Sequence, residues 1–174
     1  MRAHPAVRYV AVLGSLALLT ATSHGAPASR RDLGDEPRYA AMKNRGTAPT
    51  SKRIDGNISL RGLLEAKNES AFSTANGATI TGHVIQVERE PDGDVHLALA
   101  DAAHETNTTR WVIVEVTPAW QKRGASLGLA HLRSLVGREV RVTGWLFYEP
   151  DTQSEDPRGT RWELHPVTSI KTLD

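Results

Sequence analysis

The sequence contains no cysteine. This absence excludes disulfide bonds, thiolate zinc sites, thiol catalysis and lipid attachment through a cysteine. Aromatic residues make up only 5% of the 174 residues. No apolar run approaches the roughly eighteen residues that a membrane-spanning helix needs. A P-loop, a dinucleotide-binding glycine fingerprint and an H-E-x-x-H zinc motif are missing as well. The length suits one ordinary domain with a tail rather than two full domains.

The first 25 residues have the pattern of an export signal. Arg2 and Arg8 precede a short apolar run, Val10–Thr20, which small and polar residues follow. A basic start, a short apolar middle and small residues near a cleavage point are typical of a secretory signal peptide. We therefore predict that residues 1–25 are a signal peptide and that the mature protein is secreted or periplasmic.

Charge divides the remaining chain into two parts. Residues 26–53 hold seven basic residues against three acidic ones, with much Ala, Pro, Gly and Ser and no apolar periodicity. This composition predicts a disordered basic linker. From residue 54 onward, 12 Lys and Arg face 17 Asp and Glu, which gives a net charge of −5. An acidic domain repels phosphates, so nucleic acid is not expected as a partner.

Five segments of the domain at 54–174 are rich in Val, Ile and Thr and predict β-strands. The expected strands are Ala78–Glu88, Val95–Ala100, Arg110–Val116, Glu139–Tyr148 and Arg161–Ile170. A leucine-rich segment, Leu127–Val136, predicts a helix between the third and fourth strands, and Asn57 or Ser59 can cap a short helix that runs to about Lys67. This order is the plan of an OB-fold. We predict an all-β, five-stranded OB-fold-like barrel preceded by a short N-terminal helix.

Local motifs refine this prediction. Gly82 and Gly144 lie inside long strands, where a small barrel has to bend. The segment Glu90–Asp94 combines Pro and Gly in the pattern of a tight turn, with Gly at a positive φ. The segment Gly124–Gly128 matches the G-x-S-x-G pattern, but no strand leads directly into it. We therefore expect Ser126 to be a helix N-cap rather than a nucleophile.

Three sequence motifs are similar to those of an uncharacterised family of secreted bacterial OB-fold-like proteins. The motifs are VIVEVTP at 112–118, LVGREVRVTGW at 135–145 and WELHPVTSI at 162–170. The resemblance covers about residues 58–171 and implies the fold and export, but no activity. Some relatives carry Cys and His in the loop between the first two strands. That loop is short here and contains neither, so no role is transferred to it.

Strand alternation places the candidate site residues, because successive side chains point to opposite faces. The apolar series on the second and third strands is assigned to the core: Val95, Leu97, Leu99, Val112, Val114 and Val116. Trp162 and Leu164 are assigned to the core on the fifth strand. The opposite face then carries the candidate ligand-binding residues His96, Trp111, Glu115, Glu163 and His165. These three strands are neighbours in an OB barrel, so we expect the five side chains to converge.

The chemistry of this cluster leaves several interpretations open. His96, Glu115, Glu163 and His165 are candidate ligands for Zn²⁺ or another divalent metal, and they would also suit general acid–base work. They would equally pair across strands for modest stability. Trp111 is the candidate stacking platform. The loops Glu88–Asp94 and Glu149–Thr160 are acidic and would attract cations or basic peptides.

These patterns together indicate an exported, non-enzymatic OB-fold binding module. Its expected ligand is a small molecule, a cation or a protein, and no cofactor is required, although a divalent metal fits the cluster. One alternative is a metal-dependent hydrolase that uses the four His and Glu side chains. The other is a single-stranded nucleic-acid binder that uses Trp111 together with the basic linker.

Overall fold

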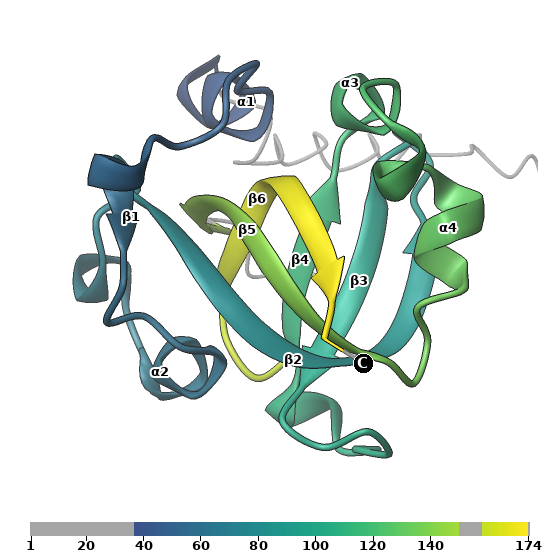
Figure 1. Ribbon diagram of the computed structural model, residues 1–174. Helices are drawn as coiled ribbons and strands as arrows, with labels where there is room; N and C mark the ends of the chain where they lie inside the picture. The colour runs from purple at the N-terminus through teal and green to yellow at the C-terminus, as the bar shows by residue number, and fades with distance from the viewer. Residues whose placement is uncertain (1–36, 150–157, 174) are drawn as a thin grey trace, which may run out of the picture. The chain divides into compact units, whose positions relative to one another are not determined.

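The computed structural model describes residues 37–149 and 158–173 (Figure 1). The signal peptide predicted for residues 1–25 and the first part of the predicted linker lie outside these ranges. The described strands form one sheet in the order β1-β2-β3-β4-β6-β5, and pairing between β2 and β5 closes it into a barrel. The strands are β1 (Ile54–Asp55), β2 (Gly77–Arg89), β3 (Val95–Ala100), β4 (Val112–Val116), β5 (Glu139–Tyr148) and β6 (Trp162–Thr172).

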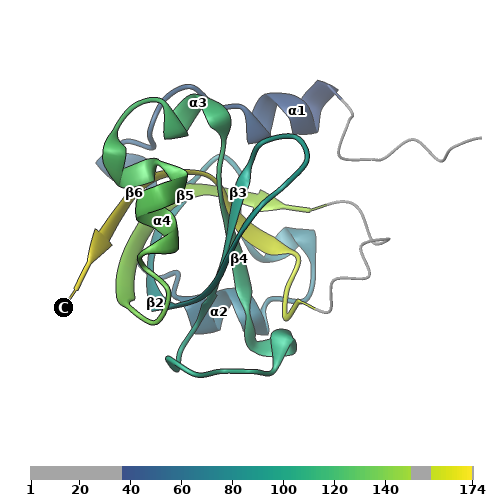
Figure 2. The same ribbon diagram turned by 90° about the vertical axis from the view of Figure 1, so that its right-hand side faces the viewer.

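The topology is that of an OB-fold, as the sequence predicts. Strands β2 to β6 form the barrel, with β2–β5 and β5–β6 antiparallel and β4–β6 parallel, while the two-residue β1 pairs with the start of β2. The described α-helices are short: α1 (Pro37–Lys43), α2 (Leu60–Glu65), α3 (Pro118–Gln121) and α4 (Leu129–Arg133). Figure 2 shows α3 and α4 beside the barrel strands, in the connection between β4 and β5. No helix among the described residues is long and apolar enough to cross a membrane.

The barrel interior contains the apolar series that strand alternation assigns to it. The inward side chains of β3, β4 and the start of β6 have no exposed surface: Val95, Leu97, Leu99, Val112, Val114, Val116, Trp162 and Leu164. Trp162 packs edge-on against Phe72 and Tyr148, and its indole N–H donates to the backbone oxygen of Asn68 at 3.0 Å. The prediction that Trp162 is a core residue is therefore confirmed.

Ser59 begins α2 as expected, because its side-chain oxygen accepts a hydrogen bond from the Gly62 N–H at 3.1 Å. The second predicted helix is shorter than the sequence indicates. A single 3₁₀ turn, η5 (Ala125–Leu127), and α4 replace it, since Gly128 between them has extended backbone. The prediction that Ser126 is a helix N-cap is wrong, because Ser126 lies within η5 and Gly128 begins α4.

Three glycines lie where the backbone conformation or a close approach leaves no room for a side chain. Gly93 has φ +95° in the turn between β2 and β3. A Cβ at Gly82 would lie 2.6 Å from Leu60 of α2, and one at Gly144 would lie 2.8 Å from the backbone oxygen of Pro166. The β5–β6 register also shifts at Gly144. The last two glycines therefore permit a helix and a neighbouring strand to approach the barrel backbone closely.

The segment that precedes the barrel is ordered where the structure describes it. Residues 37–49, which we call the strap, contain α1 and pack on the barrel. The Trp120 indole N–H donates to the backbone oxygen of Arg45 at 2.9 Å, and that of Trp145 donates to Thr47 at 2.7 Å. The Arg45 guanidinium lies 4.5 Å above the Trp145 ring. The prediction of a disordered linker is therefore wrong for the strap, because tryptophans on the barrel hold its backbone.

Candidate functional site

The predicted histidines and glutamates converge on the outer face of the barrel. His96 of β3 lies opposite Glu115 of β4 in the antiparallel register, and β6 runs parallel to β4 on the other side and supplies Glu163 and His165. The exposed fraction is 4% for Glu115 and 0% for both Glu163 and His165. Charged side chains that face outward from the barrel are thus buried, which requires something to cover them.

His165 is the centre of the cluster. Its Nδ1 lies 2.9 Å from Glu115 Oε2 and 3.7 Å from Glu163 Oε2. Its Nε2 lies 3.2 Å from Oδ2 of Asp94, a buried residue in the turn before β3. The imidazole therefore has carboxylates at both ring nitrogens, and we call Asp94, Glu115, Glu163 and His165 the buried cluster.

His96 connects the buried cluster to solvent. Its Nε2 lies 3.1 Å from Glu115 Oε2, and its Nδ1 lies 3.6 Å from Glu90 Oε1. About a quarter of its side chain is exposed, at 24%, whereas Glu115 is buried. One imidazole thus contacts a carboxylate below the surface and another carboxylate at the surface.

The strap covers the buried cluster. Phe147 of β5 packs edge-on against His165 with ring centroids 5.6 Å apart, and Tyr39 of the strap packs on the other side of Phe147 at 6.1 Å. Lys43 lies 5.3 Å from the Phe147 ring centre, and its Nζ is 3.0 Å from Glu149 Oε2. Phe147 consequently has no exposed surface, although it stands on the outward side of β5.

Burial and neighbouring charges act in opposite directions on the pKa values of the cluster. Burial raises the pKa of Glu115, but the attraction of the close imidazoles of His165 and His96 outweighs it, so the pKa lies well below its ordinary value. Burial lowers the pKa of His165, yet Glu115, Asp94 and Glu163 together hold it well above its ordinary value. Glu163 has a raised pKa, because burial and repulsion by Glu115 exceed the attraction of His165 and Arg158.

The hydrogen bonding of the buried cluster is incomplete. Among the described residues, neither ring nitrogen of His165 has a partner with hydrogen-bond geometry, although both are within ion-pair distance of carboxylates. Oε2 of Glu163 also has no hydrogen-bond partner in the part of the chain that the structure describes, whereas its Oε1 pairs with Arg158. Buried polar atoms in native proteins are nearly always satisfied by protein, water or an ion, so these three atoms need an explanation.

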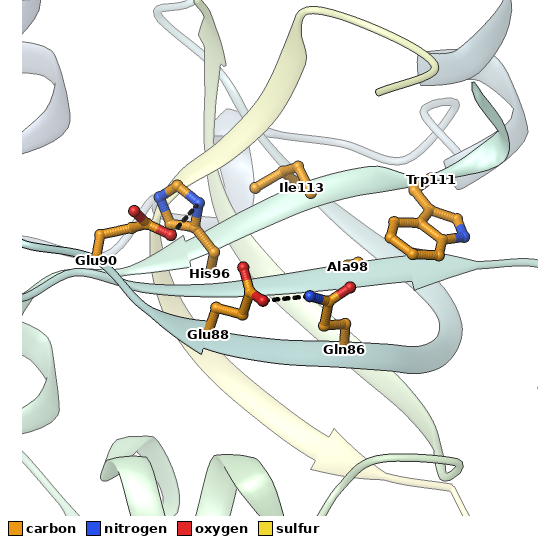
Figure 3. Close-up of a pocket in the computed structure, with 7 residues that line it drawn as sticks. All are labelled: Gln86, Glu88, Glu90, His96, Ala98, Trp111 and Ile113. Atoms are coloured by element: carbon orange, nitrogen blue, oxygen red, sulfur yellow. Dashed lines mark hydrogen bonds and ion pairs between the residues drawn. The ribbon is translucent and has the colours of Figure 1, made fainter. Parts of the chain in front are cut away.

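A pocket of about 130 Å³ opens beside the cluster on the outer face of β2, β3 and β4 (Figure 3). It is lined by Gln86, Glu88, Glu90, His96, Ala98, Trp111 and Ile113, and we call it the groove. Glu90 and His96 stand at one end and Trp111 at the other, with the hydrogen-bonded pair Gln86–Glu88 between them. The groove lies on the face of the second and third barrel strands, where OB-folds bind ligands.

Trp111 does not join the other predicted residues. Its indole N–H donates to the backbone oxygen of Glu105 at 3.1 Å, and its ring lines the groove rather than the buried cluster. The five predicted residues therefore divide between two places. Trp111 lies in the groove, Glu115, Glu163 and His165 lie in the buried cluster, and His96 contacts both.

Sequence reasoning missed three members of this site. Asp94 shares the alternation of His96 and could have been found by extending the strand pattern two residues back. Arg158 pairs with Glu163, but the predicted loop 149–160 gave no reason to bring it there. Lys43 was assigned to the linker, and only the packing of the strap places it near Glu149. The loop residues 150–157, several of them acidic, lie outside the described residues.

Comparisons with known proteins show no family for this chain. A scan against protein-family models finds no match, and a search of curated proteins finds none either. Among solved structures, the chain resembles the S. pombe Stn1–Ten1 complex at 13% identity and TM-score 0.43, covering 68% of this chain and 77% of that one. It also resembles an asparaginyl-tRNA synthetase from Entamoeba histolytica at 13% identity and TM-score 0.39, covering 61% of this chain. The match spans only 22% of the synthetase.

Proposed function

We propose that this protein is an exported, non-enzymatic OB-fold binding module whose groove takes a cationic group, either of a small molecule or of a basic side chain of a protein. The groove itself carries this proposal. It places the Trp111 ring and the carboxylates of Glu88 and Glu90 around one hollow on the ligand-binding face of the barrel.

The chemistry of the groove favours a cation. An aromatic ring attracts a cation through its π-face by about 0.5–2 kcal/mol, more when water is excluded. Carboxylates at the groove attract the same charge and repel phosphates. The hollow of about 130 Å³ suits an ammonium or guanidinium head group rather than a whole large ligand.

The buried cluster supports a binding role rather than a hydrolytic one. Glu163 and His165 have no exposed surface, so a substrate cannot reach them without displacing the strap or the barrel strands. His96 is the one member of the predicted metal set that lines the groove. A hydrolase that needs all four residues would therefore require a different arrangement.

Calorimetric titration with choline and with arginine amide tests the groove. We expect both cations to bind the wild-type protein and benzoate, an anion of similar size, not to bind. Trp111→Ala should weaken cation binding by about 5- to 30-fold, which corresponds to about 1–2 kcal/mol. Glu90→Gln should weaken it as well, since one of the two groove carboxylates is lost.

Glu65→Gln is the matched control, because it removes one negative charge from α2, outside the groove. It should leave binding unchanged. Equal loss in Glu65→Gln and Glu90→Gln would reduce the effect to general charge and contradict the proposal. Tight binding of a labelled oligothymidylate that is lost in Trp111→Ala and falls steeply with salt would instead establish nucleic acid as the ligand.

Export rests on the N-terminal pattern and needs its own test. The full chain, expressed in a bacterial host, should reach the periplasm or medium with residues up to about 25 removed, as mass spectrometry of the N-terminus would show. A chain that lacks residues 1–25 should stay in the cytoplasm. Retention of the uncleaved full chain in the cytoplasm would contradict export and leave the groove proposal standing.

A further inference from the structure

A second site lies beneath the surface, separate from the groove. Donor atoms of Asp94, Glu115 and His165 lie within 4.8 Å of one another, and all three side chains are buried. They come from three places in the fold: the turn before β3, strand β4 and strand β6. None of the three residues lines the groove.

The orphaned atoms of the buried cluster give a second, independent indication of a ligand. Both nitrogens of His165, a side chain with no exposed surface, lack a hydrogen-bond partner within residues 37–149 and 158–173. Oε2 of Glu163 is likewise without one and lies 3.7 Å from His165 Nδ1. Buried polar atoms are nearly always satisfied by protein, water or an ion, so an ion at one of these nitrogens would account for an atom that the protein leaves unsatisfied.

We propose that Asp94, Glu115 and His165 bind one Zn²⁺ ion. Imidazole nitrogen and carboxylate oxygen are both zinc ligands, and zinc sites with three protein ligands use a water molecule as the fourth. Calcium and magnesium fit less well, because they take six or more oxygen ligands and rarely use imidazole. Two carboxylates, a neutral imidazole and a divalent ion also sum to zero charge, as a buried site requires.

The geometry needs a modest adjustment to reach this state. Zinc–ligand bonds of about 2.0–2.2 Å place tetrahedral ligands about 3.4 Å apart. Asp94 is already 3.2 Å from Nε2 of His165, while Glu115 is closer to Nδ1 at 2.9 Å. Zinc bound at Nε2 therefore requires the Glu115 carboxylate to swing toward Asp94.

That adjustment also leaves the remaining two orphaned atoms, Nδ1 of His165 and Oε2 of Glu163, facing each other. With zinc on Nε2, the proton of His165 stays on Nδ1, which already faces Glu163 Oε2 at 3.7 Å. A zinc-bound histidine commonly donates its other N–H to a carboxylate, which fixes the ring and strengthens the ligand. Glu163 is in turn held by Arg158. On this assignment Glu163 orients His165 and does not itself bind the metal.

Zinc titration of metal-depleted full-length protein tests the proposal, with content measured by mass spectrometry and coordination by the visible spectrum of the Co²⁺ form. We expect one zinc per chain and the absorption of a four-coordinate Co²⁺ site. Asp94→Asn should raise the dissociation constant at least about 100-fold, more than the loss of an outer-shell partner costs. His165→Gln should do the same.

Two histidine variants outside the proposed ligand set are the controls. His96→Ala removes an imidazole that touches Glu115 and lines the groove, and His131→Ala removes an exposed histidine of α4. His131→Ala should bind zinc within about threefold of wild type, whereas His96→Ala, which removes an outer-shell partner of Glu115, should lose less affinity than Asp94→Asn. If His165→Gln fails to fold by circular dichroism, Asp94→Asn decides alone, since Asp94 lies in a turn at the barrel rim.

The proposal is overturned by any of three results. They are no stoichiometric zinc in the folded wild-type protein, unchanged affinity in Asp94→Asn, or loss of zinc in His131→Ala. Loss in His96→Ala that equals the loss in Asp94→Asn would overturn this ligand set in favour of one that includes His96. Choline binding is measured on the same zinc-free protein, so failure of the groove and failure of the zinc site are separate outcomes.

Discussion

The outer face of β2, β3, β4 and β6 has an open half and a sealed half, both carrying polar side chains. In the open half, Glu88 is exposed, and Trp111 and His96 are half-buried around the groove. In the sealed half, Glu163 and His165 have no exposed surface. Both halves follow from the same alternation along the strands. They differ because the strap and Phe147 cover one of them and nothing among the described residues covers the other.

This comparison shows that the free-energy cost of placing a charged residue on the sheet depends on what packs over it. An exposed carboxylate such as Glu88 keeps its water, and its contacts contribute little to stability. A carboxylate under the strap loses that water and needs a partner or an ion. In the sealed half the charged residues contact one another, whereas in the open half they contact one another and are also accessible to a ligand.

Glu115→Gln should have the largest effect on stability, because it alters the sealed half. The substitution keeps the shape of the side chain but removes the charge that faces His165 and His96. Removing one partner of a buried ion pair costs about 3–5 kcal/mol, and we expect a loss of that size in the free energy of unfolding. Urea denaturation of metal-depleted protein measures it. A loss below about 1 kcal/mol would show that removing a charge from the sealed half destabilises the fold no more than removing one from an exposed site.

Removal of the strap should convert the sealed half into an open one. A chain that begins at Ala48 lacks Tyr39 and Lys43, so Phe147 becomes exposed. Exposing one large apolar side chain costs about 1.5–3 kcal/mol, and we expect a similar loss of stability.

Hydrogen exchange locates the effect of strap removal. Backbone amides at 163–165 in β6 should exchange faster without the strap, whereas those at 84–88 in β2 should keep their wild-type rates, since the strap does not lie over the groove. Unchanged protection at 163–165 would show that the strap does not seal the cluster.

The stability of the sealed half should also depend on pH. We expect this effect to be smaller than that of Glu115→Gln or of strap removal. Glu115 has a lowered pKa in the fold, so its contribution is full above its ordinary value of 4.5 and is lost as the pH falls through the folded value. His165 has a raised pKa, so its contribution is full below its ordinary value of 6.5 and is lost as the pH rises through the folded value.

Metal-depleted protein should therefore be most stable between about pH 4.5 and 6.5. Thermal unfolding across this range measures the profile, and Glu115→Gln should flatten it. If the stability of the wild-type protein does not change with pH, the interpretation that His165 and Glu115 form an ion pair in the metal-free cluster is contradicted. The charged groups that face the pair are Asp94, His96, Lys43, Arg158 and Glu163.

Glu88→Gln is the smallest change and the counterpart of Glu115→Gln. Glu88 is exposed in the groove and accepts a hydrogen bond from Gln86. Surface substitutions of this kind change stability by less than about 0.5 kcal/mol, and we expect the same in urea denaturation. A loss as large as that of Glu115→Gln would mean that the groove is part of the structural core.

Much of the fold could be predicted from local pattern. The expected strands match β2 to β6 within about two residues, because alternation, β-branched composition and the turn at Gly93 are short-range signals. The helix over Leu127–Val136 was predicted too long, since its leucines face the barrel from a 3₁₀ turn and a short helix as well as they would from one helix. Burial of the leucines decides there, not helical period.

The candidate site was predicted in part, because strand alternation is a short-range signal. Alternation places His96, Glu115, Glu163 and His165 on one face, and the barrel topology makes that face continuous. Alternation also predicts that this face is exposed, which is wrong for Glu115, Glu163 and His165, because all three are buried.

Patterns in the amino-acid sequence are enough to predict the barrel, its inward-facing residues and the meeting of histidines with carboxylates on three adjacent strands. These follow from side-chain period and strand order, which are local properties of the chain. Which of those polar groups lose contact with water depends instead on long-range packing. That outcome depends on a segment more than sixty residues earlier in sequence than β4, whose basic, apolar-poor composition resembles a linker. It is ordered because tryptophans on the barrel hydrogen-bond its backbone and Phe147 packs against Tyr39.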